Sequence, residues 1–529
     1  MEPTQTRFAP RAAVAAADHL ASEAGVHMLR LGGSAADAAV AASAVMGVTS
    51  PHLCGMGGDL FALVHVDGIV YALAANGAAG SGASSGALRA AGLARVPAHD
   101  HIAATPMPGC VDGWIGLHRR FGKLPLATVL APAVDLAAEG FPASPTLAAS
   151  VPRVADRRWA GDLRGCAGAP GSMVRRPGVA RSLQAIVERG RAGWYEGEFG
   201  TGLVALGAGH FSDADLLVTQ DRWVEPLAID AFGVTLWTVP APSQGYLCLA
   251  GAAIAERSGL LGGVEVGSAA WAHALIEAAR AAGHDRESVL HEHASGDDLL
   301  DPSRLAAAVA ALRSDTAATY PDPRPRDGDT TYLCAVDSNR MGVSLIQSNA
   351  GGFGSGLGID GVGVGLQNRG QGFSLEAGHP AEIGPGRRPP HTLSPLLATR
   401  GEVLAGVLGT MGGDAQPQVL LQLIARIFGA GRGVGESIAA GRFMLRSANA
   451  VEQADGFATW RAGGRVGVDI EGHAPQEWAS ELAKRGHDAR RIQAFGHGFG
   501  HAQAILVRAD GIIEAASDPR SLASAAIGF

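Results

Sequence analysis

The chain has 529 residues, of which 47% are hydrophobic and 17% charged, and its 42 basic and 50 acidic residues give a net charge of −8. This length accommodates two to four domains or one large composite domain. The apolar fraction excludes a disordered chain, and the acidic surplus with only 5% aromatic residues argues against nucleic acid or an anionic membrane as partner. Composition therefore indicates a soluble, glycine-rich globular protein.

The cysteines and the N-terminal segment indicate a reducing compartment. No two cysteines have CxxC spacing, and an odd, scattered set does not make a disulfide framework. The first residues lack a basic stretch followed by the apolar stretch of a signal peptide, and no 18-residue uncharged apolar run occurs. We therefore expect a cytoplasmic protein. The five cysteines are Cys54, Cys110, Cys166, Cys248 and Cys334.

Four pairs of apolar runs, each separated by a short turn containing glycine, predict four β-hairpins. Asp-Gly between apolar runs is a strong hairpin signal, because a type I′ turn requires positive φ at both central residues. Hairpins favour antiparallel sheet over the parallel sheet of βαβ repeats. The predicted strand pairs are 60–66 with 69–75, 332–336 with 343–347, 396–399 with 403–409, and 504–508 with 512–516.

Between the hairpins, apolar residues at three- and four-residue spacing predict helices. The first helix begins at Ser34, with an acidic residue three positions on, which is a typical N-terminal cap. Hairpins near the start, middle and end with helices between them predict an α+β fold, with helices on both faces of one or two antiparallel sheets. The predicted helices are 34–48, 126–139, 269–282 and 303–313.

The segment from Tyr320 to Asp329 contains three prolines, a glycine and alternating charges, which predict an exposed, non-helical linker. It leads directly to Thr330, Thr331 and a predicted strand. An extended loop that ends at a hydroxyl residue on a strand is what a self-processing nucleophile requires.

Several glycine and histidine motifs favour structural interpretations. Gly82–Gly86 matches GxSxG but lacks the strand before it and the helix after it, so we interpret it as a loop. The glycine-rich run 351–358 lacks the Lys-Ser/Thr of a P-loop and favours a turn with close backbone approach. His497 and His501 are interpreted as loop or packing residues. A further polar group without metal-ligand spacing is interpreted as a solvated helix end: His284, His291, Glu292, His293, Asp297 and Asp298.

The run from Met411 to Asp414 follows a predicted strand and contains the pair Gly412-Gly413. Two adjacent glycines at a strand end can turn consecutive N–H groups toward one point. That arrangement fits an oxyanion hole and an ordinary tight turn equally well.

Together, these segments resemble the γ-glutamyltransferase family in colinear order over nearly the whole chain. Within the family, the glutathione-hydrolase-like and amidohydrolase branches are more similar to this chain than the classical transpeptidases are. This comparison rests on the variants LQNRG, PPHTL and MGGDAQPQ. The segments that carry the resemblance are GGSAADAAVAASAVMGVTSPH (32–52), GMGGDLFALV (55–64), 104–144, GDTTYLCAVDSNRMGVSLIQSN (328–349), FGSG (353–356), LQNRGQGFSL (366–375), GRRPPHTLSP (386–395), GTMGGDAQPQ (409–418) and DPR (518–520).

The resemblance implies an N-terminal nucleophile (Ntn) hydrolase with a four-layer αββα sandwich. It also implies self-cleavage between Asp329 and Thr330 into a large subunit, 1–329, and a small catalytic subunit, 330–529, which together form one composite domain. The expected partners are a small-molecule amide and the chain's own second fragment, with a dimer of such heterodimers as a further assembly. No cofactor and no metal are expected.

The same resemblance implies roles for individual residues. Thr330 would be the nucleophile, with its freed α-amino group as the base, and Ser348 would orient it. Gly412 and Gly413 would donate N–H groups to the oxyanion. From the residues alone, Ser348 could equally be a strand-end residue bonded to backbone. The substrate-binding residues expected are Asn368, Arg369, His391, Thr392 and Asp414.

The chain departs from classical members of the family where these hold the α-amino-acid part of a glutamyl group. Ala78 matches the position of an arginine that binds the α-carboxylate. Ala350 and Gly372 match an asparagine and an acid that bind the α-amine. Arg369 replaces a glutamine, and His391-Thr392 replaces a Ser-Ser pair. Arg369, with His391 nearby, could pair with a small anionic acyl group, or it could form a structural ion pair.

These features predict a self-processing amidohydrolase or acyltransferase that acts through Thr330. The family resemblance favours γ-glutamyl amides such as glutathione, whereas the missing clamp favours a small anionic amide such as oxamate. An unprocessed binding protein without catalytic activity is the third hypothesis.

Overall fold

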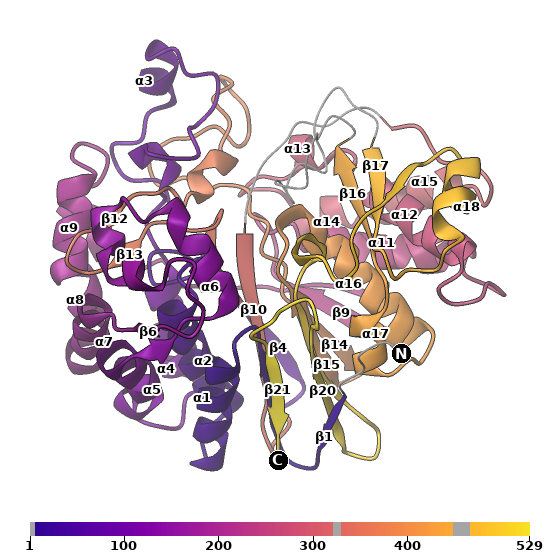
Figure 1. Ribbon diagram of the computed structural model, residues 1–529. Coiled ribbons are helices and arrows are strands. Elements are labelled where there is room, and N and C mark those ends of the chain that lie inside the picture. Colours follow the sequence, from indigo (N-terminus) through magenta and orange to yellow (C-terminus); the bar gives the residue numbers. More distant parts are fainter. Residues whose placement is uncertain (1–5, 321–328, 448–465) are drawn as a thin grey trace.

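The computed structural model describes residues 6–320, 329–447 and 466–529. Two seven-stranded sheets lie face to face at its centre, and helices cover the outer face of each sheet (Figure 1). The first sheet has the strand order β21 (Ala525–Gly528), β2 (Ala13–Ala16), β10 (Asp329–Val336), β11 (Gly342–Ala350), β3 (Asp59–Val66), β4 (Ile69–Ala75) and β7 (Arg222–Val224).

The second sheet is also antiparallel throughout. Its strands come from both ends of the chain and from two central hairpins. The order is β1 (Arg7–Ala9), β20 (Ile513–Ser517), β19 (Ala502–Val507), β15 (Val403–Thr410), β14 (Leu396–Arg400), β9 (Val234–Thr238) and β8 (Leu227–Ala231).

Alternating apolar side chains of the two sheets fill the space between them. Phe61 and Leu63 on β3, Tyr332 on β10, and Val407 on β15 belong to one buried cluster, as expected when every second residue of a strand points to the same face. Gly409 on β15 is required here, because a Cβ at this position would lie 2.1 Å from the Tyr332 ring. The sheets therefore pack closely beside the start of β10.

The first helical layer packs on the sheet that contains β10. Every residue of α2 is buried, which explains why its sequence is rich in alanine and has no polar face. Ser34 caps this helix in a reciprocal capping box with Asp37, as the sequence predicts. The layer consists of α1 (His19–Arg30), α2 (Ala35–Thr49), α4 (Cys110–Phe121), α5 (Leu126–Glu139), α7 (Pro177–Arg189) and α8 (Arg191–Tyr195).

The second helical layer packs on the sheet that contains β15, over a separate apolar core. A small three-stranded sheet extends this layer. Its members are α11 (Tyr246–Arg257), α12 (Ala269–Gly283), α15 (Pro302–Ala311), α16 (Gln416–Ile424), α17 (Val434–Ala439), α18 (Trp478–Lys484), β16 (Phe443–Ser447), β17 (Val466–Ile470) and β18 (Asp488–Arg491).

This arrangement confirms the predicted α+β class and the αββα sandwich. All four predicted hairpins and all four predicted helices are present, with small shifts at their ends. One turn differs from expectation. Asp67 and Gly68 both have positive φ, but at the last hairpin only Gly511 does, because Arg508 and Ile512 are bridged by a longer loop. Most of the linker, 321–328, lies outside the described residues.

The remaining short elements lie outside the two main sheets. Ser84 of the GxSxG motif caps α3, so a short helix does follow the motif, contrary to the expectation, but no strand leads directly into it, because β4 ends at Ala75. Among the described residues, no helix has the length and apolarity needed to cross a membrane. The short elements are α3 (Ser85–Ala90), α6 (Pro145–Ser150), α9 (Glu198–Leu206), α10 (Asp213–Leu217), α13 (Arg286–Val289), α14 (Gly296–Leu299), β5 (Phe141–Pro142), β6 (Met173–Val174), β12 (Gly358–Ile359) and β13 (Val364–Gly365).

Candidate active site

Thr330 lies at the start of β10 and is completely buried. Its Oγ1 donates a hydrogen bond to Ser348 Oγ (3.3 Å) on the neighbouring strand β11 and accepts one from Gln416 Nε2 (3.3 Å). The ladder between β10 and β11 is irregular at this point, because Asp329 pairs with Ala350 but Thr331 pairs with Gln347. A bulge of this kind re-aims side chains at a strand end, and here it brings Thr330 and Ser348 together.

Gln416 is the contact that the sequence reasoning missed. It is the first residue of α16, and its Oε1 accepts a hydrogen bond from the Ser394 N–H (3.0 Å). That bond fixes the amide so that its NH₂ group faces Thr330. Gln416 stands in the GTMGGDAQPQ segment, but no spacing rule distinguishes it from Gln418, which bonds to backbone instead.

Ser348 connects the threonine to a buried guanidinium. Its Oγ accepts a hydrogen bond from the Ala350 N–H (2.8 Å), in the manner of a strand-end serine, and another from Arg369 Nη2 (3.4 Å). Ala350 has φ +75°, an unusual value for alanine that closes this turn. The Ser348 hydroxyl therefore has the backbone partner expected of a strand-end serine and also contacts Thr330.

Arg369 is 3% exposed and forms no ion pair with a carboxylate among the described residues. Its Nη1 donates to Thr392 Oγ1 (2.9 Å), and its Nε has no partner in the described part of the chain. Burial lowers its pKa to about 10, with Asp59 and Asp414 acting in the opposite direction. Among the described residues, Arg369 thus has no carboxylate within ion-pair distance, and its guanidinium lies beside Ser348.

His391 is buried next to this group and pairs with Asp59. Its Nε2 lies 3.0 Å from Asp59 Oδ2, and its Nδ1 accepts a long hydrogen bond from the Leu393 N–H (3.4 Å). Burial, followed by the Arg369 charge, lowers the pKa of His391 to about 4, so the ring is neutral near pH 7. Since both ring nitrogens have partners within the protein, His391 orients its surroundings and does not point a free nitrogen into the site.

The Gly412-Gly413 turn follows β15 and precedes α16. Both residues have positive φ, +128° and +53°, and neither of their N–H groups donates to an acceptor among the described residues. The carbonyl of Gly413 accepts a hydrogen bond from Gln244 Nε2 (2.8 Å), which also donates to the Thr392 carbonyl (3.1 Å). The turn can therefore present two N–H donors at the N-terminal end of α16, which suits a developing negative charge.

The other residues that the sequence singled out have the following positions and contacts. Asn368 accepts a hydrogen bond from the Gly351 N–H (2.8 Å) and holds the loop after β11. Asp414 is buried and faces Arg286 at 3.5 Å. Ala78 donates its N–H to Gln220 and offers no charge. Asp329 is the first residue of β10, and its side chain lies outside the described residues.

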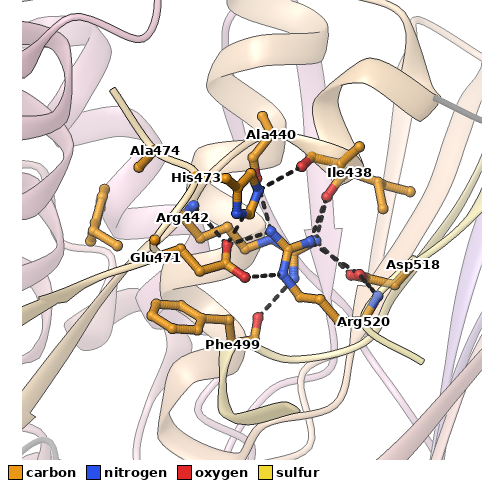
Figure 2. Close-up of polar contacts among 12 residues, drawn as sticks. Ile438, Ala440, Arg442, Glu471, His473, Ala474, Phe499, Asp518 and Arg520 are labelled. Atoms are coloured by element: carbon orange, nitrogen blue, oxygen red, sulfur yellow. Dashed lines mark hydrogen bonds and ion pairs between the residues drawn. The ribbon is translucent and has the colours of Figure 1, made fainter. Parts of the chain in front are cut away.

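Four charged side chains form a buried network next to Phe499 (Figure 2). Arg442 pairs with Asp518 (2.6 Å), Arg520 pairs with Asp518 (3.0 Å), and Arg520 also pairs with Glu471. Arg442 Nη1 donates to the carbonyl of Phe499 (2.7 Å), and the next residues, Gly500 and His501, contact the 410–412 backbone. The network thereby holds the 499–501 segment, which contacts the backbone that leads into the Gly412-Gly413 turn.

Asp518 gives this network a measurable pH dependence. Burial alone would raise the pKa of Asp518, but the charges of Arg442 and Arg520 outweigh it and lower the pKa from 3.8 to about 2. A folded-state pKa below the unfolded value adds stability above pH 3.8, and that stability is lost as pH falls through about 2. We expect Asp518→Asn to be less stable than wild type at neutral pH, with the difference shrinking across this window. Urea unfolding at a series of pH values measures it, and a constant difference would contradict the assignment.

Comparison with known proteins agrees with this geometry. The sequence profile of the γ-glutamyltranspeptidase family matches residues 21–528. The oxamate amidohydrolase proenzyme of Klebsiella pneumoniae is 33% identical, over 96% of this chain and 97% of that protein, and the glutathione hydrolase-like YwrD proenzyme of Bacillus subtilis is 32% identical, over 97% of each. The cephalosporin acylase of Bacillus halodurans superposes with a TM-score of 0.87 at 28% identity, over 99% of this chain and 97% of that structure. The chain therefore belongs to the γ-glutamyltranspeptidase family, and it is a self-processing amidohydrolase of the Ntn type.

Proposed function

We propose that Thr330 is the nucleophile of this amidohydrolase and that the chain cuts itself between Asp329 and Thr330. The observation that carries the proposal is the set of contacts around the Thr330 hydroxyl, which is held by Ser348 and Gln416 at the first strand residues after the linker. A threonine hydroxyl needs a base to become nucleophilic. Cleavage would free an α-amino group on the same residue, with a pKa near ~7.7–8.0 that suits proton transfer at neutral pH.

In the proposed reaction, Thr330 Oγ1 attacks the carbonyl carbon of an amide. Negative charge develops on the carbonyl oxygen, and the N–H groups of Gly412 and Gly413 are its proposed donors. The amine then leaves with a proton, and the acyl group remains on Thr330 as an ester. Water, or an acceptor amine, releases the acyl group and regenerates the hydroxyl.

The proposed products of processing are 1–329 and 330–529, which stay together as a heterodimer. In the first sheet, β2 from the first fragment lies between β21 and β10 from the second. Separation of the fragments would break the hydrogen bonds on both sides of β2. The pairing therefore supports a single composite domain after cleavage.

The first substrate class proposed is a γ-glutamyl amide such as glutathione, the type named for several relatives. A small anionic amide such as oxamate is the second class, because Arg369 lies beside Ser348 without a carboxylate partner among the described residues. A guanidinium in this position can bind a carboxylate through two parallel hydrogen bonds. Oxamate is also the substrate named for one relative.

Three measurements on the purified protein test the proposal together. Intact mass shows whether the chain is cut after Asp329, release of p-nitroaniline from γ-glutamyl-p-nitroanilide reports the first substrate class, and release of ammonia from oxamate reports the second. An uncut chain with neither activity would refute Thr330 as a self-processing nucleophile. A cut chain that is inactive on both compounds would refute both substrate classes and leave the nucleophile assignment intact.

Substitution of Arg369 tests whether this residue binds the anionic group of the second substrate class. We expect Arg369→Lys to raise KM for oxamate about 10- to 100-fold, because a charge-assisted hydrogen bond contributes ~1.5–3 kcal/mol and each ~1.4 kcal/mol is a factor of ten. Steady-state kinetics on the cleaved variant measures it. Arg446→Lys is the matched control, since Arg446 pairs with Asp469 in the small sheet and contacts no proposed site residue. Equal KM values for the two variants would exclude Arg369 as the anion ligand.

A further inference from the structure

The side-chain amide of Gln416 is held in a single orientation next to the proposed nucleophile. Its Oε1 accepts a hydrogen bond from the Ser394 N–H (3.0 Å), and its Nε2 donates one to Thr330 Oγ1 (3.3 Å). Exchange of the two amide atoms would set the NH₂ group against the Ser394 N–H, and two donors cannot bond to each other. Gln416 is completely buried, so solvent does not compete for either atom. Gln416 is therefore a fixed hydrogen-bond donor to the Thr330 oxygen.

The Thr330 hydroxyl has one hydrogen and two lone pairs to share among its neighbours. The hydrogen points to Ser348 Oγ (3.3 Å), and one lone pair accepts the Gln416 N–H. Among the contacts of the described residues, this arrangement leaves the second lone pair for attack on an amide carbon. Gln416 can therefore stay bonded to the oxygen that forms, and later breaks, the bond to the acyl group.

The strength of this hydrogen bond changes in opposite directions in the two halves of the proposed reaction. During acylation, Oγ1 turns from a hydroxyl into an ester oxygen, which is a poorer acceptor, so the bond from Gln416 weakens. During deacylation, negative charge develops on Oγ1, and hydrogen bonds to an ionised acceptor are about twice as strong as neutral ones. Only an interaction that is stronger in the transition state than in the ground state accelerates a step. The donor at Gln416 therefore favours deacylation.

The position of Gln416 in the fold suits this role. It is the first residue of α16, directly after the short helical turn that contains Gly413. Positive partial charge at the N-terminus of a helix stabilises nearby negative charge. The loop that fixes the amide is itself held, because Ser394 Oγ donates to the Thr392 carbonyl (3.1 Å). The segment 412–416 can thus serve both oxygens of a tetrahedral intermediate, the carbonyl oxygen through the glycine N–H groups and the Thr330 oxygen through Gln416.

We propose that Gln416 is a catalytic residue of deacylation, in which its Nε2–H group stabilises Thr330 Oγ1 as this oxygen leaves the acyl carbon. Water attacks the ester carbonyl carbon and gives a proton to the α-amino group of Thr330. The C–Oγ1 bond then breaks, its electron pair passes to Oγ1, and the α-ammonium group returns the proton to this oxygen. The assignment rests on the proposed function, in which Thr330 carries the acyl group.

Kinetics of the processed Gln416→Met variant test the assignment, because methionine keeps the length of the side chain and removes the donor. With whichever of the two proposed substrates wild type cleaves, we expect kcat and KM to fall together, about 10- to 100-fold, and kcat/KM to stay within about threefold of wild type. Quenched intact mass should show the acyl group accumulating on the 330–529 fragment. An unchanged kcat, or an equal fall in kcat and kcat/KM without acyl-enzyme, would refute the assignment.

Gln422→Met is the matched control on the same helix. Gln422 is also buried, but its amide bonds to the main chain of Gln418 and Phe443 and to no proposed site residue. We expect this variant to lower the free energy of unfolding without accumulating acyl-enzyme. Equal accumulation in the two variants would show that loss of any buried amide from α16 has this effect, and the role assigned to Gln416 would be wrong.

The Gln416→Glu variant adds a pH dependence that a purely structural role would not produce. The introduced carboxylate can still accept from the Ser394 N–H, but its charge lies beside Oγ1, so deacylation should be slower than in Gln416→Met at neutral pH. On protonation the carboxyl group becomes a donor. We expect the deacylation rate of Gln416→Glu relative to wild type to rise as the pH falls, and that of Gln416→Met to stay constant. The absence of any rise in Gln416→Glu would argue against donation from this side chain.

Self-cleavage tests the same step without an added substrate. Attack of Thr330 Oγ1 on the Asp329 carbonyl carbon would first exchange the peptide bond for an ester of equal mass, which water then hydrolyses. We expect Gln416→Met to accumulate this ester, seen as an uncut chain that neutral hydroxylamine splits into 1–329 and 330–529, and Thr330→Ala to give no such product. A wild-type chain that is neither cut nor active would refute the proposed function and this assignment with it. If wild type is cut and Gln416→Met is cut at the same rate without the ester, only the assignment of Gln416 fails.

Discussion

The Thr330→Ala variant is expected to remain a single chain of 529 residues and to lose amidohydrolase activity by roughly 10⁴- to 10⁶-fold, the range found when a catalytic nucleophile is removed. The physical reason is that both the attacking oxygen and the α-amino base would come from this one residue. Intact mass and the rate of amide hydrolysis measure the two effects. Activity within tenfold of wild type would contradict the assignment.

Thr331 offers a matched control at the next position of the same strand. It is equally buried, and its hydroxyl has no partner among the described residues. Thr331→Val removes that hydroxyl at nearly constant volume, so we expect normal cleavage and activity. If Thr331→Val stays uncut while Thr330→Ala is cut, the nucleophile is the second threonine of the pair.

The Arg520→Gln variant is expected to lose about 3–5 kcal/mol of unfolding free energy, the usual cost of removing one partner from a buried ion pair. Glu471 and Asp518 are both fully buried; Glu471 would lose its arginine partner, and Asp518 would keep only Arg442 (Figure 2). The same variant should slow self-cleavage, because the network also holds the backbone next to the glycine turn. Urea unfolding of the chain and the time course of intact mass measure these effects.

Arg508 provides the control for this experiment. It also pairs with two carboxylates, Asp510 and Glu514, but it is half exposed at the tip of a hairpin. Because surface ion pairs contribute ~0–1 kcal/mol, Arg508→Gln should have little effect on the free energy of unfolding. Similar losses of unfolding free energy in the two variants would show that the effect of Arg520→Gln does not depend on the burial of its ion pairs.

Local features of the fold could be predicted from the sequence with good accuracy. Ser34 and Asp37 mark the start of α2, and Asp67-Gly68 marks the first hairpin, because caps and type I′ turns depend on neighbouring residues only. The partners of those strands could not be predicted from periodicity. β2 lies beside β10, more than 300 residues away, and long-range pairing leaves no local pattern.

The residues of the candidate site, too, could be predicted only in part from the sequence. The family resemblance points to Thr330, Ser348 and the glycine pair. In the structure a hydrogen bond joins Thr330 to Ser348, and the glycine pair stands just before Gln416, whose side chain bonds to Thr330. The resemblance gave no reason to single out Gln416, whose role depends on a bond to Ser394 that no spacing reveals. His501, expected to be a loop or packing residue, is buried, and only the structure shows that its ring nitrogens have no hydrogen-bond partner among the described residues. For Arg369 the sequence is compatible with an anion-binding role and with a structural ion pair, and no carboxylate among the described residues lies within ion-pair distance of it.

Because the strands of the two proposed fragments are interleaved, self-cleavage changes how the protein can refold. Each central sheet combines strands from 1–329 with strands from 330–529, so the uncut chain folds in a first-order process, with both halves at the high effective concentration that a covalent link provides. Once the proposed bond is cut, refolding becomes second-order and the stability of the assembly depends on protein concentration. The covalent link in the precursor therefore assists the assembly of the two halves, and this assistance is lost when cleavage activates the enzyme.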